Sequence, residues 1–112
     1  MNLNKYFARN YEMLPGSGEW VRNREAIKCV DGFSMSVQAS KSHYCTPRDN
    51  FGPYSKVEVG FPSERVEEFM PFAEDANSPT NTVYAWVPIE IVEQVIESHG
   101  GAKADAVSEA TQ

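Results

Sequence analysis

The sequence contains no apolar run close to the roughly 18 residues that a membrane-spanning helix requires, so we expect no insertion into a membrane. Its first ten residues have neither a continuous apolar region nor a cleavage pattern of small residues. This argues against a secretory signal and favours a cytoplasmic location. Only two cysteines are present, Cys29 and Cys45. One pair is not a disulfide framework, and both should be free thiols in a reducing compartment.

Motifs of well-known chemistry are also missing. The sequence has no phosphate-binding P-loop, no Rossmann glycine fingerprint, no zinc-spaced pair of cysteines, no nucleophile elbow and no internal repeat. We therefore predict no catalytic residues, no metal ligands and no cofactor, and we expect a protein that is not an enzyme.

Basic residues are scarce in the second half of the chain. Residues 1–56 contain eight Lys and Arg against five Asp and Glu, a net charge of +3, whereas residues 57–112 contain two against eleven, a net charge of −9. Phosphate contacts require Lys and Arg, so the acidic half argues against general nucleic-acid binding. It suits a basic partner, although acidic helix faces are in most proteins simply solvated.

The residues that are present predict one compact domain. At 112 residues with 41% hydrophobic side chains, the chain is large enough for one core and too small for two. Residues 1–19 contain Pro and Gly breakers and only scattered apolar side chains, so we expect a loosely ordered N-terminal arm. Residues 102–112 have Val107 as their one large apolar side chain and are expected to form a disordered tail. The domain itself is predicted to span residues 20–101.

The clearest local pattern is a β-hairpin at residues 27–39. A two-residue turn at Asp31-Gly32 would place a lysine on the apolar face, which is a poor register. A loop of three residues, Val30 to Gly32 with the glycine in the left-handed region, instead pairs Cys29 with Phe33. This register gathers the apolar side chains on one face: Ile27, Cys29, Phe33, Met35, Val37 and Ala39. Cys29 is then a small core residue. The face expected in water has Lys28, Ser34, Ser36 and Gln38.

A third strand and a helix are predicted next. Residues 56–61 alternate in polarity, and the apolar side chains expected to face inward are Val57, Val59 and Phe61. Pro62 stops this strand, and Ser63 is a suitable N-cap for a helix that ends or kinks near Met70, because Pro71 follows. The side chains that this helix should bury are Val66, Phe69 and Met70.

A fourth strand and a second helix complete the pattern. In residues 82–87 we expect Val83, Ala85 and Val87 on one face, with Tyr84 and Trp86 on the other. Pro88 fits the first position of a helix that ends before Gly100, with His99 as a favourable cation near its C-terminus. The core face of this helix is expected to contain Ile89, Val92, Val95 and Ile96. The order β-β-(long loop)-β-α-β-α predicts an α+β fold, a small antiparallel sheet of about four strands packed with two short helices.

The connection "SKSHYCTPRDNFGPY", residues 40–54, is unusually long for a compact domain. Such connections are usually binding loops, lids or disordered segments, and the aromatic residues argue against disorder. Aromatic side chains together with Arg and small polar residues are typical of recognition surfaces. The alternative is that the rings simply cap the sheet while two prolines stiffen the loop. The candidate partner-binding residues of this loop are His43, Tyr44, Cys45, Arg48, Phe51 and Tyr54.

His43 and Cys45 suggest a second kind of site, a small enzyme or a metal-binding protein. Cysteine catalysis needs a thiolate beside an oriented base. Residues two apart in an extended segment point the same way without making that contact. A metal site could recruit Cys29 or Asp49 as well, yet the spacing does not show three or four converging ligands.

Four strings, "CVDGFSMSVQAS", "SHYCTPRDNFGPY", "VEVGFPS" and "VYAWVPIEIVEQVIESHGG", together resemble a group of small, mostly uncharacterised proteins encoded by bacteriophages and prophages. The resemblance covers about residues 20–101 and brings no functional residues with it. It implies a phage protein made in the cytoplasm of a bacterial host cell. Such proteins often bind a host macromolecule, such as a defence complex, a polymerase or a nuclease, and acidic ones sometimes imitate nucleic acid.

We therefore expect a non-enzymatic, acidic interaction protein that inhibits or modulates a host protein or complex without binding nucleic acid directly. The loop at 40–54 is one candidate binding surface. The other consists of acidic helix faces that would mimic phosphates, with Glu64, Glu67, Glu68, Glu90, Glu93 and Glu97. The alternatives are the small enzyme or metal protein and a virion or assembly component. The sequence predicts no oligomeric state.

Overall fold

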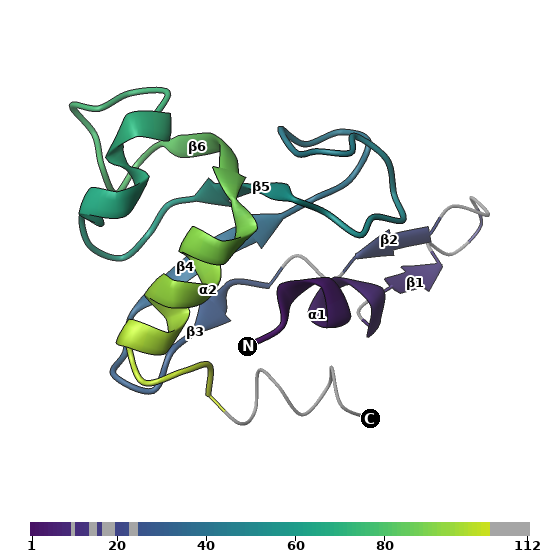
Figure 1. The fold of residues 1–112 in the computed structure, drawn as a ribbon, viewed down its shortest axis with the longest axis horizontal. Coiled ribbons are helices and arrows are strands. Elements are labelled where there is room, and N and C mark those ends of the chain that lie inside the picture. The colour runs from purple at the N-terminus through teal and green to yellow at the C-terminus, as the bar shows by residue number, and fades with distance from the viewer. Residues whose placement is uncertain (10, 14–15, 17–19, 23–24, 104–112) are drawn as a thin grey trace.

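The computed structural model describes residues 1–9, 11–13, 16, 20–22 and 25–103 (Figure 1). The elements along the chain are α1 (Leu3–Arg9), β1 (Tyr11–Met13), β2 (Trp20–Arg22), β3 (Ile27–Lys28), β4 (Ser34–Gln38), β5 (Lys56–Gly60), the 3₁₀ helix η1 (Glu67–Phe72), β6 (Val83–Pro88) and α2 (Ile89–Ser98). Strands β3 to β6 form an antiparallel sheet in chain order, and β1 pairs with β2 separately. The predicted α+β fold with a four-stranded antiparallel sheet is confirmed. No helix within the described residues is long and apolar enough to cross a membrane.

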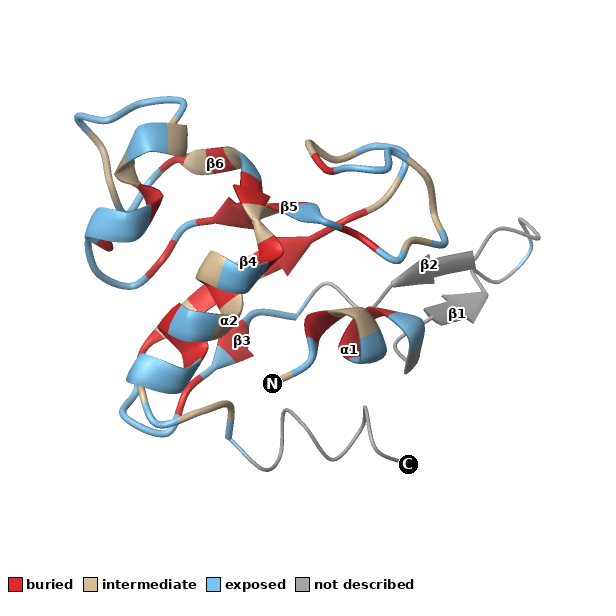
Figure 2. Cartoon of the chain, viewed as in Figure 1, coloured by how far each residue is buried: buried red, intermediate tan, exposed pale blue. Residues whose placement is uncertain are grey.

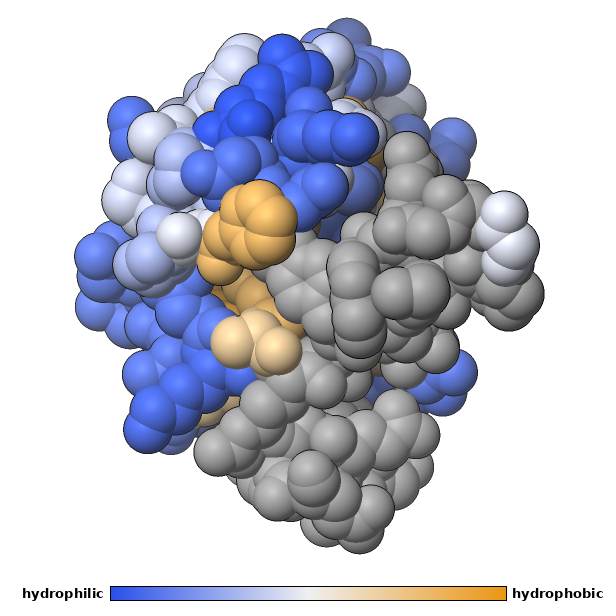
Figure 3. Space-filling view, turned by 90° about the vertical axis from the view of Figure 1, so that its right-hand side faces the viewer, coloured by the Kyte–Doolittle hydropathy of each residue, from blue (hydrophilic) through white to orange (hydrophobic). Residues whose placement is uncertain are grey.

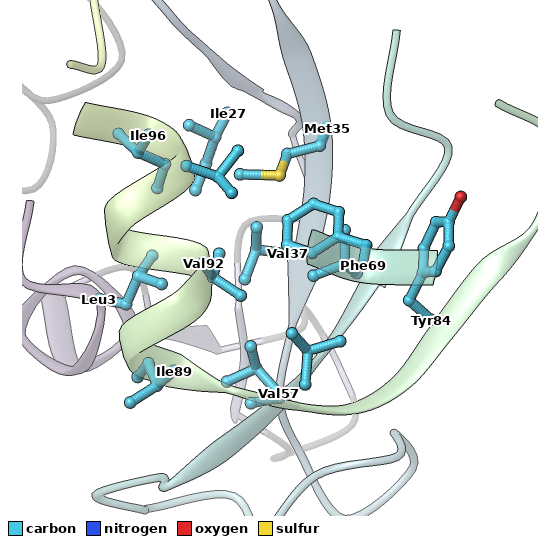
Figure 4. Packing of buried hydrophobic residues seen from close by; sticks show 14 of the residues in the cluster. Leu3, Ile27, Met35, Val37, Val57, Phe69, Tyr84, Ile89, Val92 and Ile96 are labelled. Atoms are coloured by element: carbon cyan, nitrogen blue, oxygen red, sulfur yellow. The ribbon is translucent and has the colours of Figure 1, made fainter. Parts of the chain in front are cut away.

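The core lies between one face of the sheet and helix α2, which crosses the sheet in Figure 1. Figure 2 shows that the buried positions of α2 lie along one side of the helix. Figure 4 shows side chains of α2 beside those of the strands, with Leu3 of α1 next to α2. The labelled members of this cluster include Leu3, Ile27, Val37, Val57, Ile89, Val92 and Ile96. Phe69 of η1 and Tyr84 of β6 belong to the same cluster and are fully buried.

The register predicted for the first hairpin is confirmed. Ile27 pairs with Met35, and the amide of Cys29 donates to the carbonyl of Phe33 at 2.7 Å. Gly32 has φ +97° and its amide donates to the Cys29 carbonyl at 3.1 Å, so it occupies the left-handed position that this loop requires. All six apolar side chains of the predicted inner face are buried, and Cys29 is a free thiol inside the core.

Two side chains near β4 and β5 differ from the predicted pattern, whereas Val57 and Val59 are fully buried as expected. Phe61, expected to face inward, is 56% exposed, because β5 ends at Gly60 and Phe61 turns the chain with φ +50°. Gln38, expected in water, is buried. Its side-chain amide donates to the hydroxyl of Ser36 at 3.3 Å, which offsets part of the cost of burying a polar group.

Strand β6 does not alternate as predicted. Val57 pairs with Val87 and Val59 pairs with Tyr84, so β6 contains one extra residue between these two pairs. This β-bulge places Tyr84 and Val87 together in the core, although simple alternation assigns them to opposite faces. Trp86 lies in the bulge with φ +53° and is 44% exposed.

The helix predicted to start at Ser63 begins later and is a 3₁₀ helix. Its N-cap is Val66, without a capping side chain. Ser63 bonds instead to β4, because its amide donates to the Ser34 carbonyl at 2.8 Å and its hydroxyl accepts from the Ser34 amide at 3.0 Å. Pro71 lies inside η1, so the predicted end near Met70 comes two residues too early.

Helix α2 follows the prediction. Its buried side chains are the expected ones, Ile89, Val92, Val95 and Ile96. Pro88, predicted at the first helical position, is instead the N-cap and the last residue of β6. The helix is followed by two glycines with φ +87° and +85°, Gly100 and Gly101. The Gly101 amide donates to the Ile96 carbonyl at 2.9 Å, which satisfies one carbonyl of the last turn.

Part of the predicted N-terminal arm is helical. Residues 3–9 form α1, and the side chains that it buries in the core are Leu3, Tyr6 and Phe7. These positions are three and four residues apart, which puts them on one face of a helix. The carboxylate of Glu93 on α2 accepts a hydrogen bond from the Leu3 amide at 2.9 Å and so caps the start of α1.

The first two residues of the predicted tail pair with β3. Ala102 forms a β-bridge with Cys29, and the amide of Lys103 donates to the Lys28 carbonyl at 2.8 Å. The rest of the predicted tail, residues 104–112, lies outside the described residues.

Candidate interaction surface

The connection between β4 and β5 is a folded loop that extends to the right in Figure 1. Thr46 forms a β-bridge with Lys56, and the amide of Ser55 donates to the Thr46 carbonyl at 2.8 Å. Asn4 of α1 adds a second attachment. Its side-chain amide donates to the Tyr54 carbonyl at 3.0 Å, and its side-chain oxygen accepts from the Tyr54 amide at 2.7 Å. The loop is therefore fixed to the sheet and to α1.

Two of the predicted partner-binding residues lie inside the protein. The exposed fraction of Cys45 is 2% and that of Tyr54 is 3%. Tyr54 packs edge-on against Phe7 of α1, and its hydroxyl donates to the Asp49 carbonyl at 2.8 Å. Both side chains are thus covered by the loop, and they support its shape from within. They are buried because a compact loop of this length is packed by its own side chains.

Tyr44, Arg48 and Trp86 form the aromatic cluster, which lies where the loop meets β6. The Trp86 amide donates to the Tyr44 carbonyl at 3.2 Å, and the two rings are 5.0 Å apart at 47°. The guanidinium carbon of Arg48 is 5.8 Å from the centre of the Tyr44 ring, within cation–π range. A carboxylate oxygen of Glu58 accepts from the Tyr44 amide at 3.3 Å. Tyr44 is half-buried, whereas Arg48 and Trp86 are exposed.

Trp86 belongs to this surface, although the strand pattern predicts it on the second face of a regular strand, beside Tyr84. The available signal was that strand 82–87 has apolar side chains on both faces, which requires a covering for each face. The bulge provides both coverings, because it turns Tyr84 into the core and Trp86 outward toward the loop.

The structure also shows the surroundings of His43 and Cys45. Nδ1 of His43 is 2.6 Å from the hydroxyl of Ser40. The thiol sulfur of Cys45 is 3.1 Å from the Ser40 carbonyl and 3.3 Å from the Pro47 carbonyl, so the S–H group faces backbone acceptors. Among the described residues no group of three or more His, Cys, Asp or Glu side chains could hold a metal ion. The enzyme or metal site at His43 and Cys45 remains a prediction.

Four of the six candidate glutamates contact other groups of the chain. Glu93 caps α1, and the carboxylate of Glu97 is 3.2 Å from the amino group of Met1. Glu67 pairs with Arg65 at 2.6 Å, and this hydrogen bond lowers the pKa of Glu67. Glu64 lies 3.7 Å from Nε2 of His99. Five of the six are nevertheless exposed, Glu64, Glu67, Glu68, Glu90 and Glu97, and Glu93 is half-buried. The acidic helix faces therefore remain a prediction as a partner-binding surface.

The described residues define the class of protein, a compact α+β globule with a four-stranded antiparallel sheet and short helices. Comparison of the chain with protein-family models, with curated proteins and with solved structures finds no match.

Proposed function

We propose that this chain is a non-enzymatic interaction protein that binds a partner protein through the aromatic cluster of Tyr44, Arg48 and Trp86. Trp, Tyr and Arg are the side chains most enriched at the energetic centres of protein interfaces. The indole and phenol rings present large contact areas at a low entropic cost, and the guanidinium group adds forked hydrogen bonding.

The single observation that supports this best is the backbone of Trp86. A non-glycine residue at φ +53° costs about 1 to 2 kcal/mol relative to an ordinary conformation. The bulge that imposes this conformation turns the indole outward beside Tyr44, where it is 44% exposed. Backbone strain and bulges are concentrated at functional sites, where they redirect a side chain. The strain at Trp86 is thus the expected cost of a recognition surface.

The resemblance to small phage-encoded proteins indicates the kind of partner. Under this proposal the partner is a host protein or protein complex of the infected bacterial cell, and binding inhibits or modulates it. Cytoplasmic location in the host cell is part of the same proposal, and so is the absence of a catalytic role.

The proposal is tested by a binding measurement that compares two exposed aromatic residues. Immobilised wild-type protein is incubated with bacterial lysate, and the stoichiometric partner is identified, purified and titrated by calorimetry. Trp86→Ala should weaken the affinity by about tenfold or more, as expected for the centre of an interface. Phe61→Ala is the matched control, because Phe61 is also exposed and also has a positive φ but lies outside the cluster.

Two outcomes would contradict the proposal. One is that no saturable partner is found at all. The other is that Trp86→Ala and Phe61→Ala leave the affinity equally unchanged while reversal of the exposed Glu68 and Glu90 abolishes binding, which would indicate an acidic surface.

A further inference from the structure

Phe51 is displayed at the tip of the loop with 83% of its surface exposed, more than the other large hydrophobic side chains in the described part of the chain. An isolated exposed apolar side chain is common on proteins. What distinguishes Phe51 is the construction of the turn beneath it. Figure 3 shows the side of the molecule that lies on the right in Figure 1, and its described part is largely hydrophilic apart from a small hydrophobic patch.

The turn is formed before any partner binds. One carboxylate oxygen of Asp49 accepts from the amides of Phe51 and Gly52, each at 2.9 Å. The Asp49 carbonyl in turn accepts from the buried hydroxyl of Tyr54 at 2.8 Å. Gly52 has φ +69°, and a Cβ atom there would come within 2.9 Å of the Tyr54 ring, so the chain lies flat on that ring. Because Asn4 ties Tyr54 to α1, the position of Phe51 is fixed relative to the core.

The charges around the turn are positive in an otherwise acidic protein. Residues 40–56 contain the cations Lys41, Arg48 and Lys56 against the single carboxylate of Asp49, a net charge of +2. All three cationic side chains are exposed. The Asp49 carboxylate is engaged by backbone amides, and the neighbouring Glu58 accepts from the Tyr44 amide. The loop that displays Phe51 therefore complements an acidic surface.

We propose that Phe51 is an anchor that inserts into an apolar pocket on the partner protein, and that this pocket is rimmed by Asp and Glu side chains that pair with Lys41, Arg48 and Lys56. The inference rests on the proposed function and specifies the partner's binding site. A rigid turn loses little backbone entropy on binding, so less of the free energy gained by burying the aromatic ring is lost to ordering the loop. Acidic groups at the rim fix the orientation and speed the encounter.

A protein partner fits this surface better than single-stranded nucleic acid. Proteins that bind single strands line a groove with many cations and stack successive bases on several rings. This loop offers only three cations, on a chain of net charge −6. Capture of nucleic acid is therefore an outcome that would overturn the inference.

The test uses the full chain with p-benzoyl-L-phenylalanine, a photoreactive analogue, in place of Phe51 or, as the matched control, in place of Phe61. After irradiation in bacterial lysate, mass spectrometry identifies the cross-linked peptides. We expect a protein cross-link from position 51 and none to the same protein from position 61. The attached peptide should combine apolar residues with neighbouring Asp or Glu. Cross-linking to nucleic acid, to a second copy of this chain or equally from both positions would overturn the proposal.

The affinities of Phe51 and Trp86 variants for the partner then distinguish the anchor role of Phe51 from the proposed function on which it rests. With the purified partner, Phe51→Ala should weaken binding by about tenfold or more, and Phe51→Leu, which retains an apolar side chain, by less. If Trp86→Ala weakens binding and Phe51→Ala does not, the anchor role is wrong and the proposed function stands. If neither variant weakens binding, both are wrong. Circular dichroism of each variant establishes that the fold is retained, and Phe51 is exposed enough that truncation leaves the core intact.

Discussion

At the scale of single residues, His99 joins three segments that are distant in the sequence. Its ring stacks on Phe33 with centroids 4.1 Å apart and 7° between the planes. Nδ1 lies 2.6 Å from a carboxylate oxygen of Asp31, and Nε2 lies 3.7 Å from one of Glu64. The sequence predicts only a cation at the end of a helix. The structure adds the two carboxylates, so His99 connects the hairpin turn, the segment before η1 and the end of α2.

Asp31 gives this connection a pH dependence. Its pKa is lowered, chiefly because the carboxylate accepts from the Phe33 amide at 3.0 Å and further because of its hydrogen bond with His99. A carboxyl group whose pKa is lower in the folded chain adds stability that is present above about pH 4 and is lost as the pH falls through the folded pKa. We predict that the urea midpoint of Asp31→Asn falls less than that of the wild type between about pH 5 and about pH 2.

The control for this prediction is Ser36→Ala, which changes no titrating group on β4. Its urea midpoint should fall with pH as steeply as that of the wild type, whatever its value at neutral pH. If Asp31→Asn also shows the wild-type pH dependence, the carboxylate of Asp31 does not couple folding to pH in this range.

At the scale of elements, the β-bulge in β6 links folding to the proposed site. The same extra residue that lets Tyr84 and Val87 share the core also gives Trp86 its positive φ and its place beside Tyr44. The hydroxyl of Tyr84 donates to the Pro79 carbonyl at 2.5 Å, which holds the bulged strand against the polar loop before it. The aromatic cluster is thus a consequence of how β6 packs.

The strain in the bulge can be measured by comparing two truncations of Trp86. Both Trp86→Ala and Trp86→Gly remove the indole, but only glycine adopts φ +53° without steric cost. We predict that the free energy of unfolding of Trp86→Gly exceeds that of Trp86→Ala by about 1 kcal/mol in urea denaturation. In the regular strand β4 the order should reverse, with Ser36→Ala more stable than Ser36→Gly. A Trp86→Ala variant that is the more stable of the two would show that the bulge is not strained.

Local patterns in the sequence predict the elements whose register has one good solution. The β3–β4 hairpin is one, because a shift of a single residue would expose Ile27 and Cys29. Helix α2 is another, because its apolar positions recur with the helical period and glycines follow it. The bulge is different, since the residues Tyr84 to Val87 also fit a regular strand. Only the pairing with β5 and the contact with Tyr44 select it, and these are long-range interactions.

For the candidate site, the sequence predicts the loop but not which of its rings are exposed. The length of the loop and its aromatic content are local properties, and they mark it as a candidate binding segment. Which rings face outward depends on contacts that the sequence does not reveal. Tyr54 is buried because Phe7 and Asn4 of α1 meet it, and Phe51 is exposed because Asp49 turns the chain beneath it. Neither contact follows from a periodic pattern.

The outer edge of β3 is covered by the chain itself. The Val30 amide donates to the Gly101 carbonyl at 2.9 Å, and the Lys103 amide donates to the Lys28 carbonyl at 2.8 Å. Uncovered edge strands promote pairing between molecules. A chain ending at Gly100 also loses the hydrogen bond from the Gly101 amide to the Ile96 carbonyl. We predict that it unfolds at a lower urea concentration than a chain ending at Lys103, with a loss of roughly 1.5 to 4.5 kcal/mol for the three hydrogen bonds.

Light scattering on the same pair of truncated chains tests the role of the edge directly. The chain that ends at Gly100 should self-associate at concentrations where the chain ending at Lys103 is monodisperse. Equal scattering by the two chains would show that residues 101–103 do not protect the edge.

At the scale of the whole molecule, charge is separated along the chain into a basic pole, residues 40–56, and an acidic pole, residues 57–112. The two poles would attract partner surfaces of opposite charge. The region of the loop, residues 40–56, has a net charge of +2, whereas residues 57–112 have a net charge of −9. A partner with an acidic rim would approach the loop, and a partner that normally binds nucleic acid would approach the acidic side chains of η1 and α2. Long-range charge affects mainly the rate of encounter, and salt screens it beyond about 8 to 10 Å.

Association kinetics with the purified partner therefore distinguish the two poles. Lys41 is exposed on the loop and Glu68 is exposed on η1. Reversing the charge of either side chain therefore changes the net charge of one pole without disturbing the core. We predict that Lys41→Glu lowers the association rate constant by about threefold or more at low salt, and that Glu68→Lys leaves it unchanged or raises it. The difference between Lys41→Glu and the wild type should shrink as salt is added, because screening removes the steering and leaves the contacts of Phe51 and Trp86. The opposite result, slower association of Glu68→Lys, would assign binding to the acidic pole, because only a basic partner loses attraction when that carboxylate is replaced.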